Sequence, residues 1–232
     1  MKFENFSIAI DNKKLITDFN GHFANGETTV IVGPNGCGKS TFAHGVMGRS
    51  DIIVDGKLLL NETNILELET DERAKAGIFV SWQTPPEISG VTSFGLIRDV
   101  KKITGKNMAK ELKSFKGLIN DVDLPSDWAN RQVNVGGSGG ERKRAEMVNL
   151  MSIDPRVAIL DEIDTGLDTN GLILVSSIIN KRRDEGKINL VITHNKNLLD
   201  HLEFDNGYIF RSGTLLSVPP EEIKETLTHG YK

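Results

Sequence analysis

The sequence predicts an α/β fold built on a mainly parallel β-sheet, and three observations lead to this prediction. Segments rich in β-branched residues alternate with segments of helical spacing through the last third of the chain. The apolar segment 28–32, TTVIV, has no polar alternation, which is typical of a strand buried on both faces. A glycine-rich turn and then a helical pattern follow this segment, so the turn is expected at the carboxyl end of the strand.

The individual elements follow from the spacing of apolar and turn residues. Residues 1–32 read as short strands, FSIAI and TTVIV, with turn residues at Asp11-Asn12 and Asn25-Gly26. The patterns that follow predict a helix over 39–48, a hairpin around Asp55-Gly56, a helix near 70–76 and a strand over 77–81. Helices are predicted within 93–120, and another runs from the turn 136–140 to about 152. The last third is predicted as a strand over 157–160, a helix over 170–183, a strand over 188–193, a short helix near Leu198 and strands between Tyr208 and Leu216.

Length, charge and cysteine content exclude several classes of protein. The chain has 232 residues, 28 Lys and Arg, 32 Asp and Glu, a net charge of −4 and one cysteine. One globular domain with an ordinary hydrophobic core is expected at this length. A single cysteine forms no internal disulfide and supplies too few thiolates for an iron–sulfur cluster, which favours a reducing compartment. The acidic balance argues against a nucleic-acid partner, and the sequence has neither a signal-peptide pattern nor an apolar run long enough to predict direct membrane insertion.

The first chemical motif is the glycine-rich turn after TTVIV. The segment 33–40, GPNGCGKS, fits the pattern G-x-x-x-x-G-K-[ST] between a predicted buried strand and a predicted helix. Its glycines let backbone N–H groups turn around phosphate oxygens, and the N-terminus of the helix adds positive partial charge. Lys39 would reach the β- and γ-phosphates, and the Ser40 hydroxyl would bind Mg²⁺. The alternative is an ordinary glycine turn before a helix.

The second motif is a strand that ends in two carboxylates. Asp161 and Glu162 follow the apolar strand VAIL, at the carboxyl edge where open α/β sheets place their ligands. Asp161 would hold Mg²⁺, and Glu162 would orient and polarise the attacking water. Alone, such a pair is usually a strand running into a solvated turn, but the phosphate-binding motif favours the functional interpretation.

A second glycine-rich turn, 137–140 (GSGG), also opens a predicted helix. It presents backbone N–H groups and the Ser138 hydroxyl to an anion. One chain has little use for two phosphate cradles on one nucleotide. The second cradle is therefore expected to serve a nucleotide held by another chain, in an ATP-dependent head-to-tail homodimer with two ATP molecules between the protomers.

In this order the motifs resemble those of ABC ATPases along the whole chain, with GSGGE in the place of the signature. The resemblance implies a Q-loop at Gln83, which can sense Mg²⁺ and water, a D-loop ending at Asp168, and a switch histidine, His194, able to donate a hydrogen bond to the γ-phosphate. The implied catalytic residues are Lys39, Gln83, Glu162 and His194. The implied metal ligands are Ser40, Gln83 and Asp161. The implied nucleotide-binding residues are Gly33, Pro34, Asn35, Gly36, Cys37, Gly38, Lys39, Ser40, Thr41, Ser138, Gly139, Gly140 and Asp168.

The same resemblance implies a P-loop NTPase core with an N-terminal antiparallel β subdomain and a helical subdomain between the Q-loop and the signature. Residues 1–232 are expected to form one ABC ATPase domain, in which 1–83 and 147–232 are the catalytic core with its β subdomain. Residues 84–146 are the helical subdomain and the signature helix. Ile10 stands where an aromatic residue usually stacks on adenine, and Gly137 replaces the bulky first residue of the signature.

Within ABC ATPases the chain most resembles the SufC group, the ATPase subunits of the Suf iron–sulfur cluster assembly system. The segments that carry this resemblance are 82–91 (WQTPPEISGV), 131–144 and 160–168 (LDEIDTGLD). It implies a cytoplasmic subunit that hydrolyses ATP with Mg²⁺ and drives conformational change in SufB- and SufD-like scaffold partners. Because Cys37 is the one thiol and belongs to the phosphate loop, the cluster ligands must lie on the partner. Cys37 reads as a small filler within this loop; the other reading is a thiol whose pKa is lowered by the helix N-terminus.

Two other interpretations remain open on the sequence. The first is the ATP-binding subunit of a membrane ABC transporter, and the second is a DNA-repair or chromosome-structure ATPase. The latter usually insert long coiled coils or zinc modules, whereas 100 residues without heptads separate Gly38 from Ser138. The charged run Arg142 to Arg144 reads as a solvated helix face, and the histidines other than His194 show no metal-ligand spacing and read as structural or exposed.

Overall fold

The computed structural model describes residues 1–11, 13–103, 111–211 and 213–231. Its strands are β1 (Lys2–Ile10), β2 (Lys13–His22), β3 (Thr28–Val32), β4 (Ile53–Leu60), β5 (Thr63–Asn64), β6 (Ile78–Ser81), β7 (Ile88–Thr92), β8 (Gln132–Val133), β9 (Val157–Asp161), β10 (Ile188–Ile192), β11 (Asn206–Arg211) and β12 (Thr214–Val218). Its α-helices are α1 (Lys39–Met47), α2 (Thr70–Lys75), α3 (Ser93–Ile103), α4 (Glu111–Asp121), α5 (Gly139–Ile153), α6 (Thr169–Asp184), α7 (Lys196–Leu199) and α8 (Pro220–His229). Two short 3₁₀ helices cover Ile65–Glu67 and Ser126–Asn130.

The central sheet has the order β12-β11-β3-β10-β9-β6 in the described part of the chain. Its strands run parallel except β12, which pairs antiparallel with β11 at one edge. Every residue of β3, β9 and β10 is buried, which explains why these segments are continuous apolar runs. Because β3, β10, β9 and β6 are parallel neighbours, their carboxyl ends lie side by side along one edge of the sheet. The predicted α/β class with a mainly parallel sheet is confirmed.

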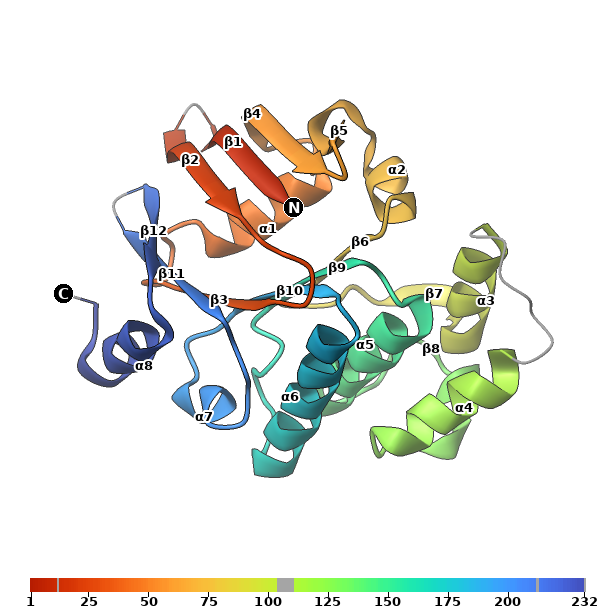
Figure 1. Ribbon diagram of the computed structural model, residues 1–232. Helices are drawn as coiled ribbons and strands as arrows, with labels where there is room; N and C mark the ends of the chain where they lie inside the picture. The colour runs from red at the N-terminus through yellow and green to blue at the C-terminus, as the bar shows by residue number, and fades with distance from the viewer. Residues whose placement is uncertain (12, 104–110, 212, 232) are drawn as a thin grey trace.

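A separate antiparallel sheet, β2-β1-β4-β5, covers one face of the central sheet, with α1 between the two (Figure 1). The space between them is filled by aromatic rings, among which those of Phe3 and Phe6 meet edge to face at 4.8 Å. Phe42 of α1 joins the same group, with its ring 5.5 Å from that of Phe3. Burial of these large rings stabilises the layer that holds the first turn of α1 against the central sheet.

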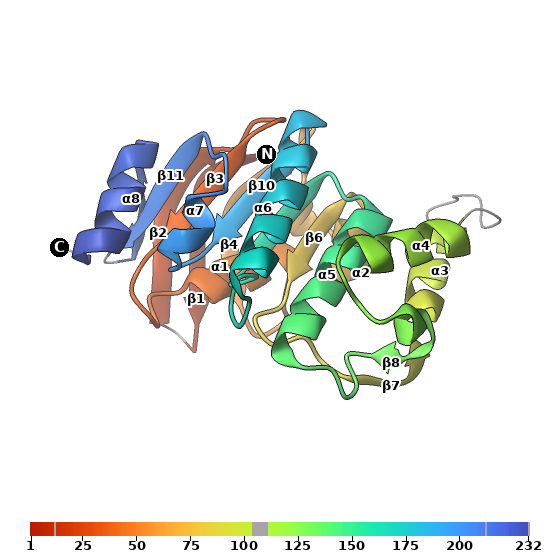
Figure 2. The ribbon, with the colours of Figure 1, turned by 90° about the horizontal axis from the view of Figure 1, so that it is seen from below.

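Helices α5, α6 and α7 cover the opposite face, and α3 and α4 lie to the side of α5 (Figure 2). Ile97 of α3 and Phe115 and Ile119 of α4 are buried in the same hydrophobic cluster as Met147 and Leu150 of α5. The helices between the Q-loop and the signature therefore share their core with the signature helix. Within the predicted range 93–120, residues 104–110 lie outside the described residues.

The hairpin predicted around Asp55-Gly56 is wrong, because both residues lie inside the single strand β4. Gly56 has φ 93°, and β4 pairs with β1 on both sides of it, Lys57 with Glu4 and Asp55 with Ser7. Asn5 and Phe6 of β1 therefore face Gly56 together, so the extra residue of this bulge lies in β1 and β4 runs on as one strand. The backbone of Asn5 lies where a Cβ at residue 56 would be, which explains the glycine. The predicted turn at Asn25-Gly26 connects β2 and β3, which belong to two different sheets. In the other predicted turn, Asp11-Asn12, residue 12 lies outside the described residues. Strands β2, β5, β7 and β8, the two 3₁₀ helices and helix α8 were not predicted.

None of the helices in the described ranges combines the length and the apolar character needed to cross a bilayer.

Candidate active site

The phosphate-binding motif forms the loop between β3 and α1. Gly38, the residue before α1, has φ 114°, a left-handed conformation that favours glycine. A Cβ on Gly33 would lie 2.6 Å from the Cβ of Phe210, so this glycine lets the loop pass directly over β11. The Lys39 ammonium is buried and donates to the carbonyls of Gly33 and Pro34 at 2.8 and 2.9 Å. The loop therefore fixes a positive charge at the N-terminus of a helix, and this arrangement favours the binding of anionic oxygens.

Asp161 is the last residue of β9 and is completely buried. Its backbone N–H donates to Ser81 Oγ at 2.9 Å, yet neither carboxylate oxygen has a hydrogen-bond partner among the described residues. Burial raises the pKa of this carboxyl, and the neighbouring Ser40 hydroxyl acts in the opposite direction. An unpartnered buried carboxylate beside a hydroxyl is a donor set that fits a hard cation such as Mg²⁺.

Glu162 connects two other predicted residues, Gln83 and His194. Its Oε2 accepts a hydrogen bond from Gln83 Nε2 at 2.6 Å, and its Oε1 lies 3.5 Å from His194 Nδ1. Gln83 follows β6, and His194 follows β10, so the contacts join the ends of three adjacent parallel strands. Glu162 has φ 48°, which for a residue other than glycine costs about 1–3 kcal/mol and is typical of functional sites.

These residues face a single cavity of about 310 Å³. Its walls are Leu15, Asn35, Gly36, Gly38, Lys39, Ser40, Thr41, Gln83, Glu162 and His194. The structure thus brings the predicted phosphate loop, Gln83, Glu162 and His194 to one place. Leu15 of β2 was missed, because nothing in its local sequence marks it. Ile10, which stands where an aromatic residue usually stacks on adenine, is partly buried and packs against the aromatic core.

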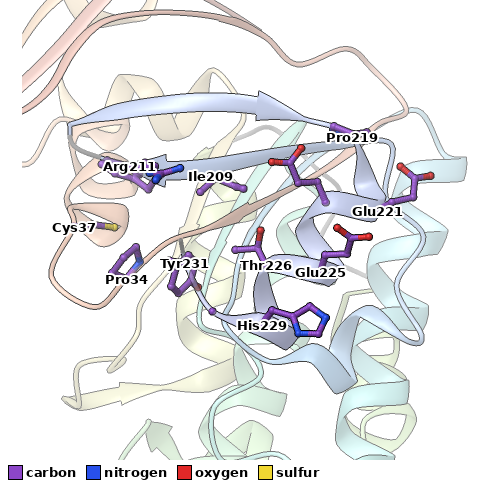
Figure 3. Close-up of a pocket in the computed structure, with 13 residues that line it drawn as sticks. Pro34, Cys37, Ile209, Arg211, Pro219, Glu221, Glu225, Thr226, His229 and Tyr231 are labelled. Atoms are coloured by element: carbon purple, nitrogen blue, oxygen red, sulfur yellow. The ribbon is translucent and has the colours of Figure 1, made fainter.

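A larger cavity of about 750 Å³ lies on the other side of the phosphate loop, between β11 and α8 (Figure 3). Pro34 and Cys37 line this cavity, and Tyr231 closes over it from the end of the chain. Of the two readings of Cys37, the lowered pKa is wrong: burial raises the pKa of the thiol, and the nearby Lys39 ammonium only partly opposes this effect. Cys37 Sγ lies 4.0 Å from Lys39 Nζ.

The signature segment and the D-loop lie together, away from these cavities. Ser138 caps α5, since its Oγ accepts from the Glu141 N–H at 3.2 Å and Glu141 Oε2 accepts from the Ser138 N–H at 2.8 Å. Asp168 caps α6, and its Oδ1 lies 3.7 Å from an Arg144 nitrogen. A Cβ on Gly140 would lie 3.4 Å from the Gly166 carbonyl oxygen. Ser138, Gly139, Gly140 and Asp168 are therefore neighbours, and none of them is among the described residues that line the 310 Å³ cavity.

Gly137, the unusual first residue of the signature, has a structural explanation. A Cβ at this position would lie 2.8 Å from Trp128, whose ring is buried and stacked under Arg131 at 5.2 Å. The indole occupies the space that a bulky residue would need. The substitution therefore reflects packing against Trp128 in the adjoining 3₁₀ helix.

The structure also reveals contacts of polar residues that the motifs did not identify. Asp164 is buried, with a pKa raised by burial, and accepts from Thr193 Oγ1 at 3.1 Å, which ties the D-loop to the residue before His194. His44 of α1 packs against the Trp82 ring at 5.0 Å. The interpretation of Arg142 to Arg144 as a solvated face is wrong for Lys143, which is 4% exposed. The contacts of His44 and Lys143 are identified only by a fold that places α1 and α5 against the end of β6.

Comparisons with known proteins identify the family. A family model described as ABC transporter matches residues 16–165. The chain is 36% identical to "Vegetative protein 296" of Bacillus subtilis, over 97% of this chain and 88% of that protein. It is 34% identical to "Probable ATP-dependent transporter ycf16" of Cyanophora paradoxa, over 100% of this chain and 93% of that protein, and 34% identical to a "Probable ABC transporter ATP-binding protein" of Streptococcus pyogenes, over 93% and 87%.

Solved structures share the fold at lower identity. An ATP-binding subunit of an ABC transporter superposes with a TM-score of 0.80 at 19% identity, covering 98% of this chain and 92% of that chain. A dimeric ATP-binding cassette in a post-hydrolysis state, bound to ADP and Pi, superposes with a TM-score of 0.78 at 19% identity, covering 94% and 97%. The predicted cassette fold is therefore confirmed. From its sequence, fold and strand-end site, the chain belongs to the ABC transporter family and is an ATP-binding cassette ATPase.

Proposed function

We propose that the chain is the ATPase subunit of a Suf-type iron–sulfur cluster assembly machine. It binds ATP with Mg²⁺, pairs head to tail with a second copy, and drives conformational change in SufB- and SufD-like scaffold partners. The observation that carries the catalytic part is the convergence of Gln83 and His194 on Glu162, beside the buried Asp161. A role that uses ATP is consistent with the cytoplasmic location expected from the sequence.

Each residue has a defined task in this proposal. The phosphate loop and Lys39 bind the β- and γ-phosphates and offset their negative charge. Ser40, Gln83 and Asp161 would hold Mg²⁺, which supplies Lewis-acid stabilisation of the phosphate oxygens. Glu162 orients the attacking water and accepts its proton, and Gln83 fixes one of its oxygens at 2.6 Å. His194 donates a hydrogen bond to the γ-phosphate.

The dimer follows from the position of the second cradle. Ser138 and the N-terminus of α5 lie outside the cavity that contains Lys39 and Glu162, so one chain does not place both cradles on one nucleotide. A second copy, turned head to tail, brings its cradle to the first copy's ATP. A related fold has been solved as a dimeric cassette bound to ADP and Pi, which supports this arrangement.

The Suf assignment rests on the segments around Gln83 and Glu162. In LDEIDTGLD the residue two after Glu162 is Asp164, whose carboxylate accepts from the Thr193 hydroxyl at 3.1 Å. The segment that begins at Trp82 also leaves an apolar surface exposed: the Trp82 side chain is 45% exposed and that of Ile88 is 37% exposed. We place the scaffold-binding surface here, beside Gln83, because a partner at this point can act directly on the hydrolysis site.

Glu162→Gln tests the catalytic part. The amide keeps the shape of the side chain but no longer accepts a proton, so we expect kcat to fall about 10²–10⁴-fold while ATP still binds. The variant should run as a dimer in gel filtration with ATP and Mg²⁺ and as a monomer without ATP. Turnover close to wild type would refute the assignment of Glu162, and a monomer at saturating Mg-ATP would refute the sandwich dimer.

Affinity capture from the native lysate, followed by mass spectrometry, tests the partner. We expect SufB- or SufD-like scaffolds to co-purify. Ile88→Asp should abolish their capture, whereas Ile53→Asp, at a 62% exposed isoleucine on the N-terminal sheet, should retain it. Recovery of membrane permeases in place of scaffolds would instead support a transporter subunit, the second candidate, which is favoured by the names of the streptococcal relatives.

A further inference from the structure

A buried ion pair lies on the signature helix, outside the cavity that contains Glu162. Lys143 and Glu146 are one turn apart on α5, are 4% and 5% exposed, and have Nζ and Oε2 at 3.4 Å. Taking two charges out of water costs several kcal/mol per ion, so such a pair contributes little to stability by itself. Its placement therefore calls for a role other than stabilisation.

Both side chains bind the backbone of one residue, Trp82. Lys143 Nζ donates to the Trp82 carbonyl at 2.7 Å, and Glu146 Oε1 accepts from the Trp82 N–H at 3.0 Å. The pair therefore holds the peptide groups on both sides of Trp82. The Trp82 indole does not hold the backbone in place, because its ring is 45% exposed and contacts His44 on one side.

Trp82 lies between the end of β6 and Gln83, so its backbone determines where Gln83 begins. Gln83 Nε2 in turn donates to Glu162 Oε2 at 2.6 Å. A continuous series of contacts thus runs from α5 through Trp82 and Gln83 to Glu162. The helix that supplies one end of this series is the one capped by Ser138.

We infer that Lys143 and Glu146 are positioning residues that couple the signature helix to Gln83, so that Gln83 reaches Glu162 only while α5 holds Trp82. The inference rests on the proposed catalytic roles of Gln83 and Glu162. The coupling would link the glycine-rich turn 137–140 to the site around Lys39 within one chain, because a shift of α5 moves the backbone that carries Gln83. Burial raises the pKa of Glu146 while Lys143 opposes the rise, which is consistent with mutual dependence of the two groups.

Lys143→Met tests the inference, because it keeps the length of the side chain and removes the donor to Trp82. We expect kcat to fall about tenfold or more, since a small misplacement of a catalytic group has effects of this size, while KM for ATP changes less than about twofold. Acrylamide quenching of tryptophan fluorescence gives an independent signal, because Trp82 is 45% exposed and Trp128 is 2% exposed. Loss of the clamp should increase the quenching.

The double variant Lys143→Met with Glu146→Gln separates positioning from charge compensation. It leaves no charge at positions 143 and 146, and its amide still accepts from the Trp82 N–H, so we expect it to recover the melting temperature lost in Lys143→Met but not the lost kcat. Recovery of both would overturn the inference, because the pair would then serve only to neutralise itself. Arg182→Met, which removes a 4% exposed arginine far from Trp82, should lower stability without lowering kcat.

Gln83→Ala, measured in parallel, separates a failure of the proposed role of Gln83 from a failure of the coupling through α5. If this variant keeps the wild-type kcat, the proposed role of Gln83 fails. If it loses activity while Lys143→Met keeps it, the role of Gln83 stands and the coupling through α5 is overturned.

Discussion

Replacing Asp161 with asparagine should make the ligand-free protein more stable while removing its activity. The carboxylate is completely buried, and neither oxygen has a hydrogen-bond partner among the described residues. Burial raises its pKa, which means that the folded protein binds a proton at this site more tightly than the unfolded chain does. The charge is therefore a cost to the fold until a cation binds it.

The expected size of the effect follows from the burial. An unsatisfied buried polar group costs about 1–3 kcal/mol, and because the amide of asparagine also needs partners, the substitution should recover about 1–2 kcal/mol. A chain of this size gains about 2–4 °C in Tm per kcal/mol, so Tm in EDTA should rise by about 2–8 °C. Asp205→Asn is the matched control: its carboxylate accepts from the Thr28 N–H at 2.9 Å and from Arg183 at 2.6 Å, so its loss should lower Tm.

Thermal unfolding as a function of pH provides the decisive assay. With a raised pKa, the carboxyl is neutral in both states at acid pH, and its cost appears as pH rises through the unfolded and then the folded pKa. The Tm advantage of Asp161→Asn should thus be largest near neutral pH and disappear at low pH. Mg-ATP should raise the Tm of wild type more than that of the variant. An unchanged or lower Tm at neutral pH, or an advantage that persists at low pH, would refute the reasoning.

Three further substitutions test other parts of the site. Lys39→Ala should abolish ATP binding in a titration with a fluorescent ATP analogue; retained affinity would show that the loop amides suffice. Gly137→Leu should lower the free energy of unfolding by about 1–3 kcal/mol in urea, because its side chain would enter the space of Trp128, and an unchanged midpoint would contradict the packing argument. Thr193→Val removes the donor to the buried Asp164 and should cost about 1–3 kcal/mol together with a fall in kcat, whereas a stability loss without any fall in kcat would limit Thr193 to a structural role.

The parallel core, the phosphate loop and the Asp161–Glu162 pair were predictable because their signals are local, whereas Gln83 and His194 were placed by the resemblance to ABC ATPases. TTVIV became β3 with every residue buried, and VAIL became β9 ending at Asp161. Once both strands are parallel neighbours of β10, their carboxyl ends must meet, so residues more than 100 positions apart share one cavity. The glycine-rich loop needed no distant information, since the backbone conformation of Gly38 is required by the turn itself.

The errors and omissions arose where a residue's role depends on a partner far away in the chain. Asp55-Gly56 has the composition of a turn, but pairing with β1 on both sides keeps it inside a strand. Lys143 lies in a run of charges that, on its own helix, looks solvated; it is buried because β6 ends against that helix and offers the Trp82 carbonyl. Charge patterning along one element does not show which charge a second element will cover.

Contacts within the chain explain how an acidic residue is tolerated next to the second cradle, the glycine-rich turn 137–140. Glu141 follows Gly140 directly, and a free carboxylate there would repel a phosphate. Its carboxylate is instead turned back onto the Ser138 N–H at 2.8 Å, and this bond lowers its pKa, with Arg131 and Arg144 contributing further. The negative charge is thus compensated within the chain. Because the Glu141 N–H already donates to Ser138 Oγ, in the proposed dimer the N–H groups of Gly139 and Gly140 are the ones that would face an anion brought by a second copy. In the proposed head-to-tail dimer, this cradle would face the nucleotide of the other protomer.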